Sequence, residues 1–281
     1  MPDDYKVEDF YELRNWIPPK QDNLIEYGIL LPETKMLYFG PAKLAWKSNL
    51  AIHTAYCLAK GIDWFGFKTA KCLPYTIQIE SPKALFRERM IKYGQNDQMP
   101  RNMLFTTTHN LKIDTSWGLA HLLTLGKRAQ DRFPDLSLVF ILDPMYKIMA
   151  GKLTEDYDIR RFEDNIDEAR VKLGAAFIII HHPRLTRVSG SGEVIDLGAE
   201  EMFGSSMLMN WADTIVKIKS LNPMTGKDHV RLSFDLCKNT TTLLPDLELR
   251  WSRATLQPTV LKRSIPEESE EVSVRNIEQE K

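Results

Sequence analysis

The chain has 281 residues, of which 43% are hydrophobic and 27% are charged, and its formal net charge is -1. This composition is typical of a globular protein with a sizeable core, and the balanced charge excludes a globally basic surface for nucleic acids. The three cysteines form no CxxC pair, and no apolar run approaches the roughly 18 residues of a membrane span. These features argue against a disulfide framework, a zinc site and a membrane partner, and we expect a cytoplasmic protein.

The N-terminal part predicts a strand, a loop and a helix, in that order. Residues 1–26 are polar, contain a Pro-Pro pair and are typical of a lead-in segment. Residues 36–39 predict an apolar strand, and a loop follows at 40–46. Over residues 48–60 the apolar side chains recur at helical spacing, and a glycine then ends the pattern.

Strand and helix patterns alternate through the middle of the chain. Apolar runs predict strands at residues 75–79, 103–105, 138–142 and 176–180. Helical patterns occupy residues 83–94, 117–132 and 159–173. Continuous apolar strands separated by helices indicate an α/β fold, in which helices cover both faces of a mainly parallel central sheet.

The C-terminal part changes character. Residues 214–220 and 230–235 predict antiparallel strands around a short turn, and residues 247–251 predict a further strand. The stretch 264–281 is rich in glutamate and serine and has no apolar period, so we expect an acidic, disordered tail. The prediction is therefore one domain over residues 1–263, which includes the lead-in segment, followed by the tail.

The segment between the first strand and the first helix fits a phosphate-binding loop. Such a loop needs backbone N–H groups and a helix N-terminus that point at one spot. Lys47 would then reach the terminal phosphates of ATP, and Ser48 would bind Mg²⁺. The predicted nucleotide-binding residues are Gly40, Pro41, Ala42, Lys43, Leu44, Ala45, Trp46, Lys47, Ser48 and Asn49.

This loop departs from the usual G-x-x-x-x-G-K-[ST] pattern in two ways. Gly40 lies one residue further from Lys47 than the pattern requires, and Trp46 stands where the second glycine belongs. The alternative interpretation is an ordinary turn between a strand and a helix, in which Lys47 is solvated and Ser48 caps the helix. The loop taken alone leaves both interpretations open.

Asp143 ends the apolar strand at residues 138–142 and precedes a proline. The carboxyl ends of parallel strands meet at one edge of a sheet, where α/β proteins bind their ligands. A carboxylate at this edge is suited to support Mg²⁺ beside the phosphates, so we predict a metal site that contains Ser48 and Asp143. The alternative is an aspartate that caps a turn at the end of the strand.

The order of these segments resembles one known group of ATPases. GPAKLAWKSNLAIHTAYCLAKG is followed by IQIES, LVFILDPMYKI, LGAAFIIIHHPR, EMFGSSMLMNWADTIVKI and KNTTT. The series extends over residues 24–251 and resembles the RecA-like P-loop ATPases of the RepA type, hexameric replicative helicases of plasmids, and their phage relatives. The resemblance implies an ATPase with a RecA-like core, a mainly parallel sheet, and antiparallel strands toward the C-terminus.

The resemblance also assigns catalytic roles. Glu80, which ends the strand YTIQIE, matches the carboxylate that orients and deprotonates the attacking water, and a general base must lie near the phosphates. His181 and His182 match the position that senses the γ-phosphate, and strand alternation points only one of them at the nucleotide, for which we choose His182. The alternatives are a solvated glutamate before a helix and a histidine satisfied at a strand end.

Lys238 matches a basic residue that reaches the nucleotide of a neighbouring subunit. Many relatives carry a second basic residue two positions later, where this chain has Thr240. A single cation can still stabilise the negative charge that develops in the transition state. The resemblance therefore implies that Lys238 is catalytic and that the chain forms a homo-oligomer, most simply a hexamer.

Two segments match the DNA-binding loops of this group, residues 145–158 and residues 183–204. They carry the four predicted contacts to single-stranded DNA, Lys147, Lys152, Arg184 and Arg187. A ring would repeat these cations around one strand, which reconciles DNA binding with a net charge of -1. The alternative is that these four residues are ordinary solvated charges on surface loops.

The leading hypothesis is an ATP-driven motor on single-stranded DNA, a ring-shaped replicative helicase. One alternative is a RecA-type recombination or annealing ATPase that forms filaments. The other is a degenerate ATP-binding assembly protein, which the altered phosphate loop suggests. The joint presence of Lys47, Ser48, Glu80 and Asp143 argues against degeneracy. Translocation along DNA would distinguish the motor from the filament.

Overall fold

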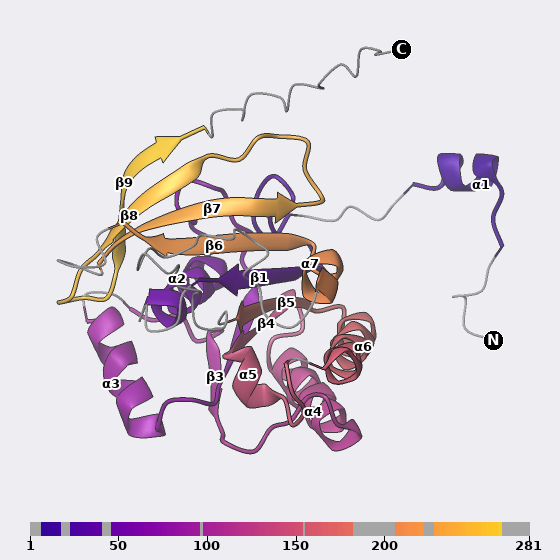
Figure 1. The fold of residues 1–281 in the computed structure, drawn as a ribbon, viewed down its shortest axis with the longest axis horizontal. Helices are drawn as coiled ribbons and strands as arrows, with labels where there is room; N and C mark the ends of the chain where they lie inside the picture. The colour runs from indigo at the N-terminus through magenta and orange to yellow at the C-terminus, as the bar shows by residue number, and fades with distance from the viewer. Residues whose placement is uncertain are drawn as a thin grey trace, which may run out of the picture.

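The computed structural model describes residues 7–17, 23–40, 46–95, 98–153, 155–181, 206–221 and 228–265. Within these residues one sheet of nine strands runs through the molecule in the order β3-β2-β4-β5-β1-β6-β7-β8-β9, and helices pack against it (Figure 1). The order departs from chain order at two places, since β2 lies between β3 and β4, and β1 lies between β5 and β6.

The parallel half of the sheet contains β1 (Lys35–Phe39), β2 (Leu73–Gln78), β3 (Leu104–Thr107), β4 (Leu138–Asp143), β5 (Ala176–His181) and β6 (Thr214–Ser220). Each pairing among these strands is parallel. β1, β2, β4 and β5 are buried along their whole length, as expected for strands between two layers of helices. Their carboxyl ends meet at one edge of the sheet.

The antiparallel half contains β7 (His229–Cys237), β8 (Asp246–Trp251) and β9 (Pro258–Ser264). Each pairs antiparallel with the strand before it, beginning with β6. β6 therefore joins the two halves, with β1 on one side and β7 on the other. β1 and β7 point in opposite directions (Figure 1), so β7 ends at the edge where the parallel strands begin.

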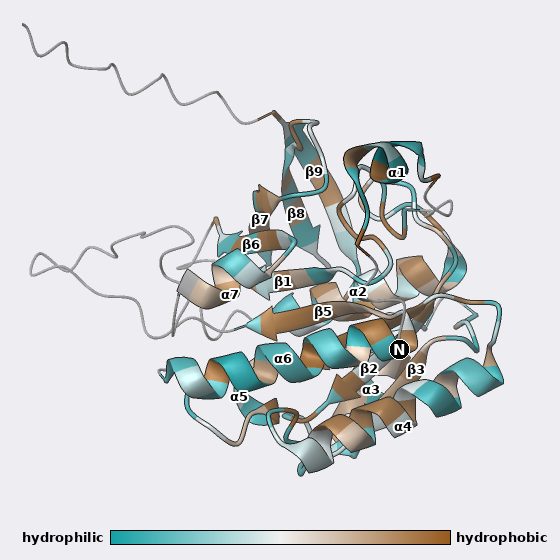
Figure 2. Cartoon of the chain, turned by 90° about the vertical axis from the view of Figure 1, so that its right-hand side faces the viewer, coloured by the Kyte–Doolittle hydropathy of each residue, from teal (hydrophilic) through white to brown (hydrophobic). Residues whose placement is uncertain are grey.

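Two hydrophobic cores lie on the two faces of the sheet. Helices α2 (Trp46–Lys60) and α3 (Lys83–Tyr93) contribute to one core, and α4 (Ser116–Arg132) and α6 (Asp156–Leu173) contribute to the other. Successive residues of a strand alternate between them: Met36 and Tyr38 belong to the first core, and Leu37 and Phe39 to the second. Figure 2 looks onto the face that α4 and α6 cover.

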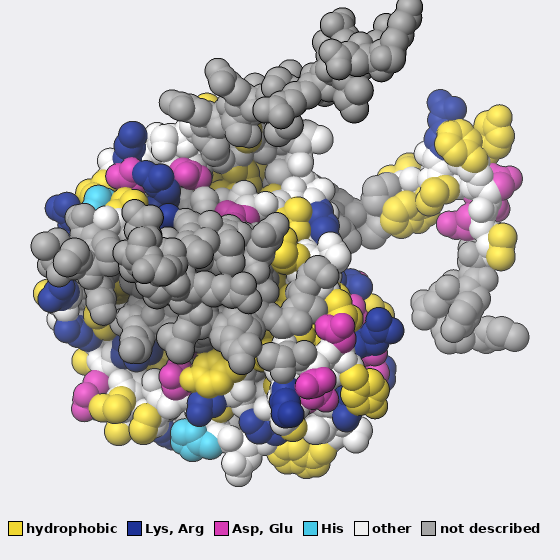
Figure 3. All heavy atoms as spheres, viewed as in Figure 1, with side chains coloured by type: hydrophobic (Ala, Val, Ile, Leu, Met, Phe, Trp, Pro, Cys, Tyr) yellow, Lys and Arg dark blue, Asp and Glu magenta, His cyan; other side chains and the backbone are white. Residues whose placement is uncertain are grey.

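Three short helices complete the described part, α1 (Phe10–Asn15), α5 (Met145–Ile148) and α7 (Ser206–Trp211). A capping box formed by Asp9 and Glu12 closes the N-terminus of α1, yet α1 buries no side chain. Its large apolar residues, which project beside the main body (Figure 3), are among the most exposed in the chain: Phe10 is 69%, Tyr11 68% and Leu13 60% exposed. None of the described helices is long and apolar enough to cross a membrane.

The structure confirms the predicted fold class and most of the predicted elements. The helices predicted at 83–94, 117–132 and 159–173 correspond to α3, α4 and α6. The sequence pattern did not predict α1, α7 or β9. β6 was predicted only as an antiparallel strand, and this was incomplete because β6 also pairs in parallel with β1.

The predicted boundary between the domain and the tail needs one adjustment. β9 includes Ser264, which the sequence analysis assigned to the tail, because this residue still pairs with Asp246 of β8. Residues 266–281 lie outside the described residues, so the disorder of the tail stays a prediction.

Candidate nucleotide site

The carboxyl edge of the parallel strands brings three predicted site residues into one cluster. Lys47 lies in the first turn of α2, Asp143 ends β4, and Glu80 follows β2. β2 and β4 are neighbours in the sheet, with Gln78 opposite Asp143. Burial lowers the pKa of the Lys47 ammonium, and the charges of Asp143 and Glu80 both act against this lowering. Residues far apart in the sequence therefore form one electrostatic unit.

Lys47 is buried, with only 1% of its surface exposed. Its Nζ donates a hydrogen bond of 2.7 Å to the carbonyl of Gly40, the residue that follows β1. Burial lowers the pKa of Lys47 from 10.5 to about 8, and the two carboxylates offset part of this effect. The interpretation of Lys47 as a solvated surface lysine is therefore wrong. A buried cation at a helix N-terminus is favourable beside an anion such as a phosphate.

Asp143 is also buried, with 2% of its surface exposed. Its Oδ2 accepts a hydrogen bond of 3.0 Å from Nε2 of Gln78, and its Oδ1 has no hydrogen-bond partner by distance and angle. Burial raises the pKa of Asp143, while the nearby Ser48 hydroxyl and the Arg89 guanidinium favour the charged form. A buried carboxylate oxygen in this setting is a suitable ligand for a cation.

Gln78 connects the two carboxylates of the site. β2 ends at Gln78, so Glu80 does not end the strand as predicted but lies on the exposed turn toward α3. While Nε2 of Gln78 holds Asp143, its Oε1 accepts hydrogen bonds from the backbone N–H groups of Glu80 at 2.8 Å and Ser81 at 3.3 Å. The Gln78 side chain therefore fixes the backbone of Glu80 relative to Asp143.

Tyr146, in α5, holds the side chain of Glu80. Its hydroxyl donates a hydrogen bond of 3.2 Å to Oε1 of Glu80. Burial and the negative charge of Glu80 raise the pKa of Tyr146 to about 12, so the hydroxyl keeps its proton at neutral pH. Tyr146 is consequently a constant donor that orients the carboxylate.

The sequence analysis missed Gln78, Tyr146 and Arg89. Arg89 is half-buried on α3, and its charge lowers the pKa of Asp143. A signal was present for Gln78, because a polar residue inside an otherwise apolar strand is expected to have a specific partner. Arg89 and Tyr146 give no such signal, since each stands where an exposed helical residue is also acceptable.

Asn49 and Ser48 follow Lys47 in the first turn of α2. Ser48 is half-buried beside Asp143. Asn49 is buried, and its Oδ1 has no hydrogen-bond partner by distance and angle. Both side chains thus present polar atoms near the start of the helix, in agreement with a polar ligand at this place.

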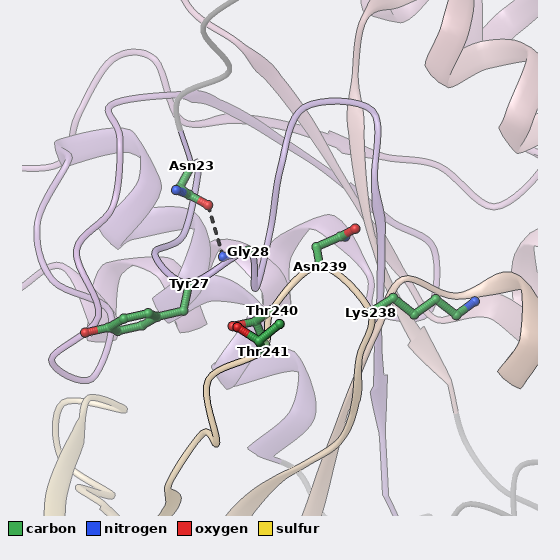
Figure 4. A pocket seen from close by; sticks show the side chains of 7 residues that line it. All are labelled: Asn23, Tyr27, Gly28, Lys238, Asn239, Thr240 and Thr241. Carbon is green, nitrogen blue, oxygen red and sulfur yellow. Dashed lines mark hydrogen bonds between the residues drawn. The ribbon is translucent and has the colours of Figure 1, made fainter. Parts of the chain in front are cut away.

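Lys238 lies at the opposite edge of the sheet and does not join this cluster. It follows β7, its backbone N–H donates to the carbonyl of Asp213 at 2.9 Å, and its ammonium donates to the carbonyl of Asn210. It borders an open pocket of about 540 Å³ (Figure 4), which is lined by Asn23, Tyr27, Gly28, Lys238, Asn239, Thr240 and Thr241. Within one chain, Lys238 is therefore separated from Lys47 by the length of the strands.

The segment after β4 is more ordered than the predicted loop at 145–158. α5 and the start of α6 occupy its two ends. Nζ of Lys112 donates to the carbonyls of Lys147 at 2.6 Å and Met149 at 3.0 Å, and Asp114 accepts the N–H of Gly151 at 2.8 Å. The prediction of a loop over the whole range is wrong, although Lys147 and Lys152 themselves are exposed.

Several predicted residues lie outside the described residues. They are Pro41, Ala42, Lys43, Leu44 and Ala45 in the phosphate loop, together with His182, Arg184 and Arg187. His181, the other histidine of the pair, ends β5 and is buried. The roles assigned to these residues stay predictions.

A comparison with protein families agrees with this arrangement. The AAA domain family (AAA_25) matches residues 2–187, a range that includes the phosphate loop, Glu80 and Asp143. The chain belongs to this AAA domain family. The match supports a P-loop ATPase, whereas the narrower RepA-type assignment is not tested by it. No curated protein matches this AAA domain in sequence.

Solved structures with the same fold include an ATPase domain and a replicative helicase. The ATPase domain of G40P superposes with a TM-score of 0.61 at 10% identity, over 82% of this chain and 85% of that one. The second is a DnaB-like replicative helicase, whose structure was described together with its interactions with primase. It superposes with a TM-score of 0.61 at 10% identity, over 83% of this chain and 58% of that one. At such low identity, these likenesses establish the RecA-like fold.

A third structure widens the comparison. A KaiC-like protein from the hyperthermophilic archaeon Pyrococcus horikoshii OT3 superposes with a TM-score of 0.58 at 12% identity, over 87% of this chain and 100% of that one. The fold is therefore shared by a helicase and by proteins of other names, and the choice between activities must come from the residues.

Proposed function

We propose that this AAA domain hydrolyses ATP at the carboxyl edge of β1, β2 and β4, and that it acts as a motor on single-stranded DNA within a ring-shaped homo-oligomer. The single observation that carries the ATPase is the cluster in which the buried Lys47 and Asp143 lie within electrostatic reach of the exposed Glu80. Isolated buried charges cost free energy, so a cluster of this kind is typical of a functional site.

The residues present fit Mg²⁺, which prefers oxygen ligands and keeps several waters. Asp143 offers a buried Oδ1 that lacks a hydrogen-bond partner, and the Ser48 hydroxyl lies beside this carboxylate. These two residues would hold the ion, directly or through its waters. When bound, Mg²⁺ would neutralise part of the phosphate charge.

The other residues divide the chemistry of hydrolysis among them. Lys47 would bind the terminal phosphate, since the first turn of α2 and its ammonium both attract anions. Glu80 would take a proton from the water that attacks the γ-phosphorus, while the bond from that phosphorus to the bridging oxygen breaks and ADP leaves. Tyr146 and Gln78 would keep Glu80 in place through the hydrogen bonds described above.

Two observations support assembly with further copies of the chain. Lys238 lies at the edge of the sheet opposite Lys47, so it can reach a nucleotide only if another subunit presents one. A head-to-tail ring brings opposite edges of successive subunits together. The exposed apolar side chains of α1 also support contact with another surface. A hexamer follows from the resemblance to the RepA-type helicases.

Binding of single-stranded DNA rests on the exposed Lys147 and Lys152, together with Arg184 and Arg187 further along the chain. Lys147 lies in α5, directly beside Tyr146, with its Nζ 5.4 Å from the tyrosine ring centroid. A DNA contact on Lys147 would therefore lie next to the residue that orients Glu80. This proximity offers a short route by which DNA binding would influence hydrolysis.

The test is a comparison of ATP turnover with and without single-stranded oligonucleotide, together with unwinding of a forked DNA duplex. We expect turnover to rise with DNA and the wild-type protein to unwind the fork only when ATP and Mg²⁺ are present. The variant in which Lys147, Lys152, Arg184 and Arg187 become alanine should keep basal turnover but bind DNA more weakly. The slope of its log binding constant against log salt concentration should fall by about 0.7 for each lost contact.

A matched control replaces exposed lysines elsewhere. Lys127 and Lys172 have 70% and 56% of their side chains exposed, on α4 and α6. Their replacement by alanine should leave the salt slope unchanged. Turnover that does not respond to DNA, together with no unwinding, would contradict the motor and leave only the ATPase part of the proposal.

A further inference from the structure

Trp46 occupies the position that a phosphate loop usually gives to glycine. It is the first residue of α2 and is buried, with 7% of its surface exposed. Its indole stacks on that of Trp251, the last residue of β8, with ring centroids 5.1 Å apart and planes inclined by 14°. Trp251 is also buried, at 2% exposure. This pair joins the start of the phosphate-binding helix to the antiparallel half of the sheet.

The other end of the loop rests on β6, the strand that joins the two halves of the sheet. A β-carbon at Gly40 would collide with the backbone carbonyl of Ile218 in β6, so only glycine fits there without a shift of β6. The adjacent Phe39 has the Nζ of Lys217, also in β6, at 6.0 Å from its ring centroid. Strands β6 and β8 therefore contact the chain immediately before and immediately after the phosphate loop.

We propose that Trp46 and Trp251 are positioning residues for the nucleotide, and that β6 and β8 form the rear support of the phosphate loop. Offset stacking of two large aromatic rings fixes both their separation and their tilt. It thereby fixes the first turn of α2, where the helix N-terminus and the Lys47 ammonium attract anions. The inference rests on the proposed nucleotide site.

A consequence distinguishes this role from ordinary core packing. If Trp46 merely filled space, its replacement by the glycine of the usual motif would destabilise the protein but restore the common sequence of a phosphate loop. If the stack positions the helix start, that replacement releases the helix start and also introduces a residue with more backbone freedom. The glycine variant should therefore bind nucleotide more weakly, although its sequence is closer to the common pattern.

The experiment measures binding of a fluorescent ATP analogue and steady-state ATP turnover in the full chain. We expect Trp46→Gly and Trp251→Ala each to raise the Kd and the KM for ATP by about tenfold or more, with kcat changed by less than about threefold, because positioning acts on the bound ground state. The double variant should be no weaker than either single variant, since both remove one interaction. Trp46→Phe and Trp251→Phe should restore most of the affinity.

Trp117 provides the matched control, since it is 54% exposed on α4, which packs against the opposite face of the sheet from α2. Trp117→Ala should leave Kd and KM unchanged. If the glycine or alanine variants fail to fold, the two phenylalanine variants decide, and each should raise the Kd by about two- to fivefold. The stack itself is followed by near-ultraviolet circular dichroism, where Trp46→Phe and Trp251→Phe should remove the same signal.

Two outcomes would overturn the inference. In one, folded Trp46→Gly or either phenylalanine variant binds nucleotide as tightly as the wild type. In the other, the losses in Trp46→Gly and Trp251→Ala add in the double variant, which would make them independent. Failure of the proposed function is distinguishable, because the wild-type protein itself would then show no nucleotide binding.

Discussion

The buried residues of β2 and β4 differ in kind from those of β7 and β8. β2 and β4 bury Thr76, Gln78 and Asp143 among their apolar residues, whereas the buried residues of β7 and β8 are all apolar, namely Val230, Leu232, Leu247, Leu249 and Trp251. Both pairs of strands belong to one sheet. Buried polar groups cost free energy unless they are paired, so their concentration in the parallel half indicates where the chemistry takes place.

The antiparallel half serves a different purpose. Its buried side chains alternate with half-buried or exposed ones along β8, which is the pattern of a sheet with one partly solvated face. It contacts the phosphate-binding helix through Trp251 and ends next to Lys238. The parallel half thus holds the reactive groups and the antiparallel half helps to hold them in place; in the proposed ring, the antiparallel half would face a neighbouring subunit.

Removal of the Lys47 ammonium should produce the largest effect on ATP binding, because it removes the buried cation from the nucleotide site of the parallel half. We expect Lys47→Ala to weaken ATP binding by about hundredfold or more, a loss of about 3 kcal/mol. Titration of a fluorescent ATP analogue measures this, with exposed Lys127→Ala as control. Unchanged affinity in a folded Lys47→Ala variant would assign the nucleotide to another part of the molecule.

Replacement of Asp143 should separate stability from function. Burial raises its pKa, so the ionised carboxylate costs stability at neutral pH, and Asp143→Asn should unfold at the same temperature as the wild type or higher. The same variant should lose most of the Mg²⁺ dependence of ATP binding, about tenfold, because an amide is a weaker ligand. Calorimetry measures the unfolding temperature, and a magnesium titration measures the Mg²⁺ dependence of ATP binding. An unaltered magnesium dependence would remove Asp143 from the metal site.

The lowered pKa of Lys47 predicts opposite trends in binding and stability. As the pH rises through about 8, the free protein loses this charge, and the Kd for ATP should increase by up to about tenfold per pH unit. Between about 8 and 10.5 the unfolded chain still holds the proton, so the free energy of unfolding should rise with pH. A Lys47→Arg variant keeps its charge and should lose both trends. A flat binding profile in the wild type would contradict the assignment.

The smallest predicted effect concerns Tyr146. Tyr146→Phe removes only the hydrogen bond that orients Glu80, and turnover should fall by about three- to tenfold with the Kd for ATP unchanged. Tyr157→Phe, whose ring is 71% exposed on α6, is the control. A larger loss than that caused by Glu80→Gln would mean that the hydroxyl acts on the phosphates and not through Glu80.

Much of the parallel half of the sheet is predictable from the sequence. Its strands are continuous apolar runs, and each is followed by the polar residues that the parallel topology brings to one edge, as Lys47, Glu80 and Asp143 illustrate. The residues that position these groups are harder to predict. Gln78 acts through a side-chain hydrogen bond to a residue of another strand, and Trp46 meets Trp251 only because β8 lies beside the loop.

There are physical reasons why some elements were not predicted from the sequence. β9 is exposed along most of its length, so it lacks the apolar period on which strand prediction depends. α1 spans only 6 residues, but Asp9 and Glu12 stand in the spacing of a capping box, and that spacing was a usable signal. The order after β4 comes from Lys112 and Asp114, whose contacts with that segment no local pattern reveals.

The most direct test of the central claim is Glu80→Gln, studied with Glu88→Gln on the exposed face of α3 as control. The amide keeps the size of the side chain but cannot accept the proton of the attacking water. We predict that ATP turnover falls by at least about hundredfold, the usual contribution of a general base, while the Kd for ATP stays within about threefold of the wild type. Turnover within about tenfold of the wild type, a barrier change of only about 1.4 kcal/mol, would contradict the account.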